Sequence, residues 1–158
     1  MLLGTLRNRL SELGLTASDL ASDMFVAQEV LLPFMDVADI PGQITQILDG
    51  IEGQLEEIAA FYVRALQLAD GELSGKSIRL VRFSSNQDLW KHVPDSKQIS
   101  LSCVMHNQIL MRSQRLLRDL GIKTEIIEFS SPGYAQWLGQ VQVPDSPVAV
   151  ARWATEQQ

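Results

Sequence analysis

The amino-acid sequence predicts an α+β fold that is mainly α: an N-terminal helical bundle with a long helix, followed by a small strand-helix-strand-helix region. Before residue 70, apolar residues recur three and four positions apart, which is typical of helices packed on one face. The runs SIRLVRF and IKTEIIEF come only in the second half and predict strands. Between the two patterns lies DGELSGK, whose composition is typical of a linker, so we expect domains at 1–72 and 73–158.

The chain's 158 residues are enough to bury a core, and its net charge of −6 is unevenly divided. Residues 1–72 carry three basic and twelve acidic residues, a net charge of −9. The remaining residues carry ten basic and seven acidic residues, a net charge of +3. The DNA-binding part of a protein usually has the opposite sign, so the charge of the first half argues against strong DNA binding there.

The sequence also indicates where the protein acts. No apolar run approaches the roughly 18 residues of a membrane helix, and the start MLLGTLRNRL has its arginines after the short apolar stretch, unlike a signal peptide. The single cysteine, Cys103, cannot form an internal disulfide. We therefore expect a cytoplasmic protein with no membrane partner.

The first two helices are marked by residues that start and stop helices. Three leucines on one helical face predict the first helix: Leu6, Leu10 and Leu13. Gly14 follows as the left-handed residue that ends it. Thr16 and Asp19 have the spacing of a capping box, which predicts a second helix over about 17–24.

A third short helix is predicted after the second. Apolar residues there recur every four positions: Val26, Val30 and Phe34. Pro33 should kink or shorten this helix because proline lacks a backbone donor. In this register, Leu31, Leu32 and Met35 would face outward.

Helical periodicity also runs through residues 43–69, which predicts a long amphipathic helix. Gly50 and Gly53 weaken it by about 1 kcal/mol each relative to alanine, which favours a bend or a close helix contact there. In the second half, the expected helices are one from about Leu101 to Leu120 and a shorter one from Ser130 to Leu138.

The window from Leu15 to Pro41 resembles the helix-turn-helix of lambda-repressor-like and Cro-like proteins. Leu20 and Ala21 match the inward pair of its second helix, where a small residue lets two helices cross closely. The sequence is similar to a phage and bacterial group that includes anti-CRISPR-associated repressors and YdiL-like proteins. In that group the recognition helix ends in Trp-Glu-x-Gly with a proline soon after; here Phe34 stands for the tryptophan and Pro41 for the proline. The later runs DLWKHVPD and GYAQWL look like the group's C-terminal motifs, so the resemblance covers nearly the whole chain.

The resemblance implies a transcriptional regulator, a homodimeric repressor that binds double-stranded DNA. Glutamine can pair with adenine and glutamate can accept from cytosine, so these residue types on a recognition helix allow base reading. The implied DNA-binding residues are Thr16, Ser18, Gln28 and Glu29 near the bases and Arg7 and Arg9 on the backbone.

Several residues depart from the pattern. Phe25 stands where a small or left-handed turn residue is expected, and Ala27 stands at the N-cap, where losing the cap costs about 1 kcal/mol. A dimer would offer about four arginines, fewer than the roughly six to ten phosphate contacts of strong salt-dependent binding. Glu29 and Asp36 would repel phosphates. The alternative is a degenerate helix-turn-helix that acts as a protein-protein interaction module without DNA binding.

The other candidate residues favour structural roles, and we expect no enzyme, no cofactor and no metal. His106 has no nucleophile spaced to use it, and one cysteine with two histidines argues against a metal site. The basic stripe Arg112, Arg115 and Arg118 suits a solvated face or a partner for the acidic half, with phosphate binding as the alternative. The tryptophans are expected in the core or an interface.

Overall fold

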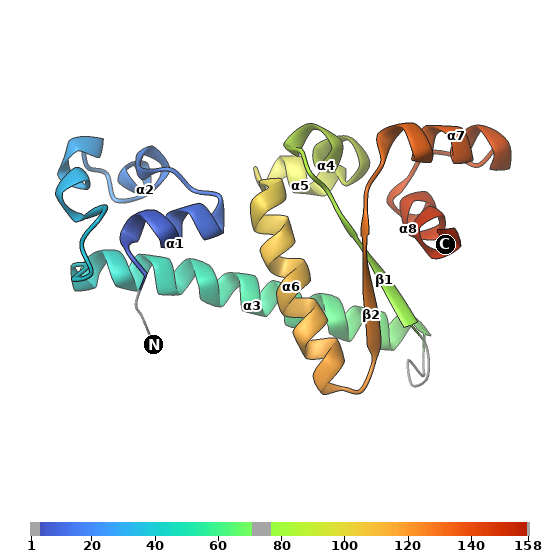
Figure 1. Cartoon of the computed structure of the whole chain (residues 1–158), viewed down its shortest axis with the longest axis horizontal. Coiled ribbons are helices and arrows are strands. Elements are labelled where there is room, and N and C mark those ends of the chain that lie inside the picture. The colour runs from blue at the N-terminus through green and yellow to red at the C-terminus, as the bar shows by residue number, and fades with distance from the viewer. Residues whose placement is uncertain (1–3, 71–76, 158) are drawn as a thin grey trace. The chain divides into compact units, whose positions relative to one another are not determined.

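The structure, a computed structural model, describes residues 4–70 and 77–157, and the chain divides into two compact units, 1–57 and 58–158 (Figure 1). The division falls within the long helix, whereas the sequence predicts it at about residue 72. Residues 71–76 of the expected linker lie outside the described residues.

From residue 4 on, the first unit contains two α-helices, two short 3₁₀ helices and the start of a long helix. Their bounds are α1 (Leu6–Leu13), α2 (Ala17–Asp23), η1 (Gln28–Val30), η2 (Leu32–Phe34) and α3 (Gly42–Asp70). The predicted caps are confirmed. Gly14 ends α1 in the left-handed conformation, at φ 68°, and Thr16 and Asp19 form the capping box that starts α2.

The core of the first unit is aliphatic. Its buried side chains come from α1, α2, the 3₁₀ region and the first half of α3: Leu6, Leu10, Leu13, Leu20, Ala21, Leu31, Met35, Ile44, Leu48 and Leu55. Burying such side chains is the main force that holds the short helices on α3, because helices of seven or eight residues are marginal alone.

The predicted third α-helix is wrong. Residues 26–36 form η1 and η2 instead of a continuous α-helix. The predicted faces are also wrong, because Leu31 and Met35 are buried whereas Val26 and Val30 are exposed. Apolar residues are so frequent in this stretch that more than one register satisfies the pattern, and Pro33 interrupts helical hydrogen bonding.

Helix α3 is continuous over its 29 residues, as the periodicity predicts. The expected close helix contact at its glycines is wrong within the described residues. A Cβ atom added at Gly50 or Gly53 would meet nothing within 4 Å.

Among its described residues, the second unit adds two strands and five helices to the end of α3. Their bounds are β1 (Ser77–Arg82), α4 (Asn86–His92), α5 (Pro94–Gln98), α6 (Cys103–Asp119), β2 (Lys123–Glu128), α7 (Ser131–Val141) and α8 (Pro147–Glu156). These elements confirm the predicted strands, the long helix near 101–120 and the helix near 130–138. Helix α8 was not predicted. The fold class is α+β, mainly α, as expected.

The two strands of the second unit pair in parallel, with Ser77 opposite Lys123 and Arg82 opposite Glu128. Parallel strands need a long crossover, which here runs through α4, α5 and α6. Figure 1 shows α6 on one side of the strands and α8 on the other, and both helices contact β1. The small sheet is therefore covered by helices, as a parallel sheet requires.

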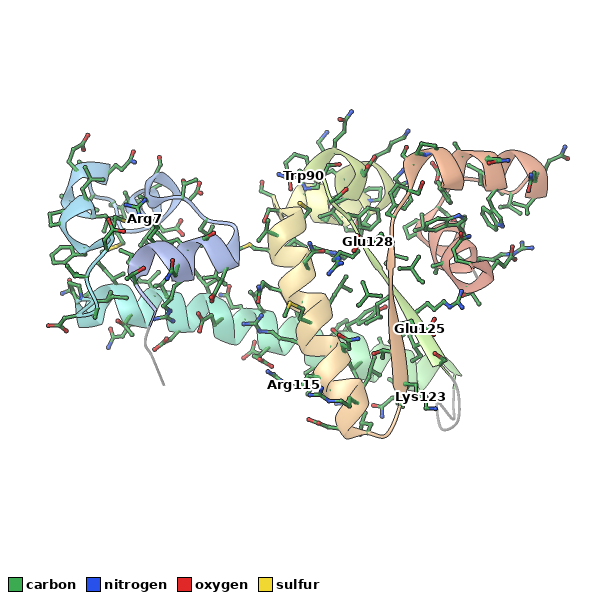
Figure 2. The ribbon with its side chains drawn as sticks, viewed as in Figure 1. Arg7, Trp90, Arg115, Lys123, Glu125 and Glu128 are labelled. Atoms are coloured by element: carbon green, nitrogen blue, oxygen red, sulfur yellow. The ribbon has the colours of Figure 1, made fainter. Side chains whose placement is uncertain are left out.

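Aromatic rings form the main core of the second unit. The buried rings are Phe83, Phe129, Tyr134, Trp137 and Trp153. Trp90 (labelled in Figure 2) packs against this core, and its indole N–H donates to the carbonyl of Leu101 at 2.7 Å. The expected core role of the tryptophans is confirmed. Both runs singled out in the sequence, 88–95 and 133–138, contribute to this one core.

Candidate interaction surface of the first unit

The segment that contains η1 and η2 is held against α1 by backbone and side-chain bonds. The backbone N–H of Arg7 donates to the carbonyl of Met35 at 2.9 Å. Next to this bond, Leu31 is fully buried and Met35 nearly so. These contacts fix the segment on the unit and leave the side chains around them at the surface.

A groove of about 380 Å³ lies between this segment and the first two helices, and we call it the N-terminal groove. It is lined by Arg7, Leu10, Ser11, Leu15, Thr16, Ala17, Gln28, Leu32 and Met35. Three of the six predicted DNA-binding residues line it: Arg7, Thr16 and Gln28. The other three, Arg9, Ser18 and Glu29, do not. Because more than half of the lining residues are apolar, the groove suits an apolar group with a few polar contacts at its edge.

Arg7, labelled in Figure 2, is held by a carboxylate of the same unit. Its Nε and Nη2 atoms donate to the two oxygens of Asp36 at 2.6 and 2.9 Å, a bidentate pair. The hydrogen bond and the attraction to Asp36 raise the pKa of Arg7, and the bond to Arg7 lowers the pKa of Asp36. The positive charge predicted to contact a DNA backbone is therefore already matched.

Arg9 lies farther from solvent and is matched twice. Its Nη2 atom donates to Asp49 at 2.9 Å and to Glu52 at 3.1 Å, and its side chain is only 15% exposed. Burial alone would lower the pKa of Arg9, but the bonds to Asp49 and Glu52 outweigh burial and raise it. Arg9 thus fastens α1 to α3 and is not presented to a ligand.

Thr16 is also occupied by a local structural role. Its Oγ1 atom accepts from the backbone N–H of Asp19 at 3.1 Å and donates to the Asp19 carboxylate at 2.8 Å. That carboxylate also accepts from the backbone N–H of Thr16 at 2.7 Å. Ser18, Gln28 and Glu29 are exposed. Thr16 is exposed as well, so all four residues predicted to read bases have solvent access, but the hydroxyl of Thr16 is engaged by Asp19.

Phe25 is the most unusual residue of the surface. Its side chain is 96% exposed, and its backbone is left-handed at φ 56°. A bulky residue in this conformation stores strain of about 1 kcal/mol or more, and at this exposure the ring gains almost nothing from burial within the chain in return. The sequence indicates it only as an aromatic residue at a turn position that favours glycine.

Three more apolar side chains near Phe25 in the sequence are exposed, and with it they form what we call the exposed apolar segment: Phe25, Val26, Val30 and Leu32. Leu32 also lines the N-terminal groove, so the segment and the groove adjoin. Concentrated exposed apolar side chains are typical of surfaces that meet another molecule. The sequence predicts this property wrongly for Leu31 and Met35, which are buried, and correctly for Leu32, which is 56% exposed.

In the second unit, the candidate residues from the sequence are His106 and the arginines of the basic stripe, and they contact or adjoin other residues of the fold. The ring of His106 lies 5.8 Å from that of Phe83, and burial lowers the pKa of His106 to about 4. Arg112 donates to the carbonyl and the side chain of Gln108. Arg118 lines a separate hollow of about 630 Å³ together with Lys123 and Glu125, both labelled on β2 in Figure 2. Glu125 pairs with Arg79 at 3.1 Å, so the lining carries a net positive charge.

A buried polar group that sequence reasoning missed lies at the end of α4. His92 is almost fully buried, its Nδ1 atom is 3.5 Å from Asp145, and Tyr134 donates to the same Asp145 oxygen at 2.7 Å. Burial and the bond to Asp145 raise the pKa of Tyr134. Nothing in the sequence pairs these residues, because they come from α4, α7 and the loop before α8.

Among the described residues, no group of three histidine, cysteine or carboxylate side chains could hold a metal ion. No helix in the same described ranges is long and apolar enough to cross a membrane. Comparison of the chain with known proteins found no family model that matches and no similar curated protein. The chemistry of the surface is therefore the basis for a functional proposal.

Proposed function

We propose that the first unit is a protein-protein interaction module, which uses the exposed apolar segment and the adjoining N-terminal groove to bind a basic amphipathic helix of a partner protein. The observation that carries this proposal is Phe25. An aromatic ring that is 96% exposed on a left-handed backbone destabilises the fold, so the ring serves a purpose other than the folding of this chain.

The charge of the first unit supports a basic partner. Residues 1–57 contain two arginines and ten carboxylate residues, a net charge of −8. Both arginines pair with carboxylates of the unit, so the remaining charge at its surface is negative. Complementary charge would steer a basic helix toward this surface and reject an acidic one. An amphipathic helix seats its apolar side chains in a groove of this kind.

DNA binding, the function implied by the helix-turn-helix resemblance, stays a prediction. Its recognition helix is replaced by η1 and η2, and binding phosphates would require Arg7 and Arg9 to leave Asp36, Asp49 and Glu52. The surface charge favours a protein partner over a phosphate backbone. One experiment can compare the two classes of ligand directly.

The test uses three probes with the full chain: an amphipathic helical peptide of leucine and lysine, the same peptide with glutamate in place of lysine, and random duplex DNA. Binding is followed by fluorescence anisotropy at about 50 mM salt and then through a salt titration. We expect the lysine peptide to bind and the other two probes not to bind. DNA binding with a steep salt dependence would overturn the proposal in favour of the regulator, and failure of both peptides would overturn it as well.

Two variants show whether the expected surface is responsible. Phe25→Gly should weaken lysine-peptide binding at least about tenfold, because exposed aromatic anchors dominate such interfaces. The same change should stabilise the fold by up to about 1 kcal/mol, since glycine accepts a left-handed backbone. Val37→Ser is the matched control: Val37 is 41% exposed in the same unit but belongs neither to the exposed apolar segment nor to the lining of the groove. Equal binding by Phe25→Gly and Val37→Ser would contradict the assignment.

A further inference from the structure

The second unit has an apolar ridge on the last turns of α3. Phe61 is 75% exposed and Leu68 is 78% exposed. They are seven residues apart, so they project from nearly the same side of the helix, two turns from each other. A pair of large apolar side chains this exposed is a candidate contact surface.

A groove lies beside the ridge, between α3 and the end of α6. Its volume is about 390 Å³, and its lining is Ala60, Val63, Arg64, Gln67, Leu116, Asp119 and Leu120. On α3 it extends from Ala60 to Gln67, which is also a span of seven residues. At a rise of about 1.5 Å per residue, ridge and groove have the same length along the helix. A surface with a ridge and a matching groove side by side can be complementary to itself.

Two opposite charges line this groove. Arg64 comes from α3 and Asp119 from α6, and within the described residues neither side chain forms an ion pair. In a twofold interface, the same patch of each copy faces the other, so a contact from one residue to another occurs twice. An Arg64 side chain that reaches the other copy's Asp119 would therefore form two equivalent ion pairs.

We propose that two copies of this chain associate through this face, with the Phe61–Leu68 ridge of each copy in the α3–α6 groove of the other and Arg64 of each copy opposite Asp119 of the other. The two α3 segments then run antiparallel. The apolar ridge supplies the binding energy, and the charges set the register and direction. This association does not depend on the partner proposed for the first unit.

Charge exchange between two variants tests this arrangement in the full chain. Arg64→Glu alone places a glutamate opposite each Asp119, and Asp119→Arg alone places an arginine opposite each Arg64. Each variant should dimerise at least about tenfold more weakly than the wild type, because like charges then face each other. In a heterodimer of the two variants, Arg64 of the Asp119→Arg chain faces Asp119 of the Arg64→Glu chain. The glutamate introduced in one chain faces the arginine introduced in the other. The mixture should therefore form heterodimers more tightly than either variant dimerises alone, measured by sedimentation velocity with one variant labelled.

The mixing experiment separates the interface from any structural role of the two residues. Mixing changes nothing within either variant chain around positions 64 and 119. Only contacts between chains can therefore restore association. Phe61→Ser should also weaken the dimer, whereas Val148→Ser, at an equally exposed position on α8, should not. The proposal would be overturned if the wild-type chain stayed monomeric at millimolar concentration. It would also be overturned if the mixed variants associated no more tightly than each variant does alone.

Discussion

The two units of the chain use different kinds of core. The first unit is packed with leucine and other aliphatic side chains, whereas the second unit has five buried aromatic rings beside a smaller aliphatic cluster of Val63, Leu80, Leu110, Leu117 and Ile122. In the second unit the rings of Phe129 and Tyr134 have centroids 5.6 Å apart, and those of Phe129 and Trp153 meet edge to face at the same distance. Rings with such specific geometries fit few alternative arrangements, whereas leucines fit many. The pattern of apolar residues in a sequence therefore shows where an aliphatic unit lies, but not which of its side chains face the core.

The two cores also give each unit its own spectroscopic signal. All three tryptophans lie in the second unit, so tryptophan fluorescence follows that unit alone. Amide hydrogen exchange in α1 and α2 follows the first unit. Variants can therefore be assigned to the unit that they affect.

A carboxylate in the aliphatic core should cause the strongest destabilisation. Leu31 is fully buried, so Leu31→Asp would place an unpaired charge among aliphatic side chains and should destabilise the first unit by about 4 kcal/mol or more. We expect rapid hydrogen exchange in α1 and α2, while the tryptophan emission of the second unit keeps its folded wavelength. Loss of both signals together would contradict the independence of the two cores.

The neighbouring residue supplies the matched control. Leu32 is 56% exposed, so Leu32→Asp should change the stability of the first unit by less than about 0.5 kcal/mol. The pair of variants tests which of the two leucines faces the core. If Leu32→Asp were the more damaging of the two, the inward position of Leu31 would be wrong.

An effect smaller than that of Leu31→Asp is expected in the second unit, and it depends on pH. Burial beside Phe83 lowers the pKa of His106 from 6.5 to about 4. Above pH 6.5 the imidazole is neutral in both the folded and the unfolded chain. As the pH falls from 6.5 to about 4, the unfolded chain takes up a proton that the folded chain does not, so the free energy of unfolding decreases. The decrease from this one residue should reach about 3 kcal/mol at pH 4.

His106→Gln separates this contribution from the carboxylates that also titrate in acid. Stability is measured by denaturant titration with tryptophan fluorescence from pH 7.5 to pH 4 for both proteins, at about half-unit steps. The difference between wild type and His106→Gln should be constant above pH 6.5 and should turn steadily against the wild type below it. A difference that does not vary with pH would show that His106 is accessible to protons in the folded state.

Local sequence rules predicted much of this fold. Residues that act on their immediate neighbours gave correct results: Gly14 and Thr16 bound the first two helices, and the β-branched runs at 77–83 and 122–129 contain the two strands. The caps are correct because a cap depends on hydrogen bonds to residues three or four positions away. The parallel pairing of the strands then follows from the long helix between them.

The candidate site could be predicted only in part, because its chemistry depends on contacts between distant residues. Arg7 pairs with Asp36, and Arg9 pairs with Asp49 and Glu52. These carboxylates lie 29 to 43 residues away in the sequence, and they determine whether the arginines can bind a ligand. The register around Leu31 is decided by packing against the other helices, which a run of apolar residues does not reveal. Exposure of Phe25 could be anticipated only from its turn position.

The last change tests whether a groove residue stabilises the fold or contacts the partner. Thr16 lines the N-terminal groove and also caps α2, so Thr16→Ala should destabilise the first unit by about 1 kcal/mol. Thr16→Ser keeps the hydroxyl and should restore most of that stability, and Ser18→Ala, at an exposed position on the same helix, should have no effect. Because the Thr16 hydroxyl is engaged with Asp19, lysine-peptide binding by folded Thr16→Ala should equal that of the wild type. Weaker binding at unchanged stability would instead assign Thr16 to the partner surface, which the capping geometry argues against.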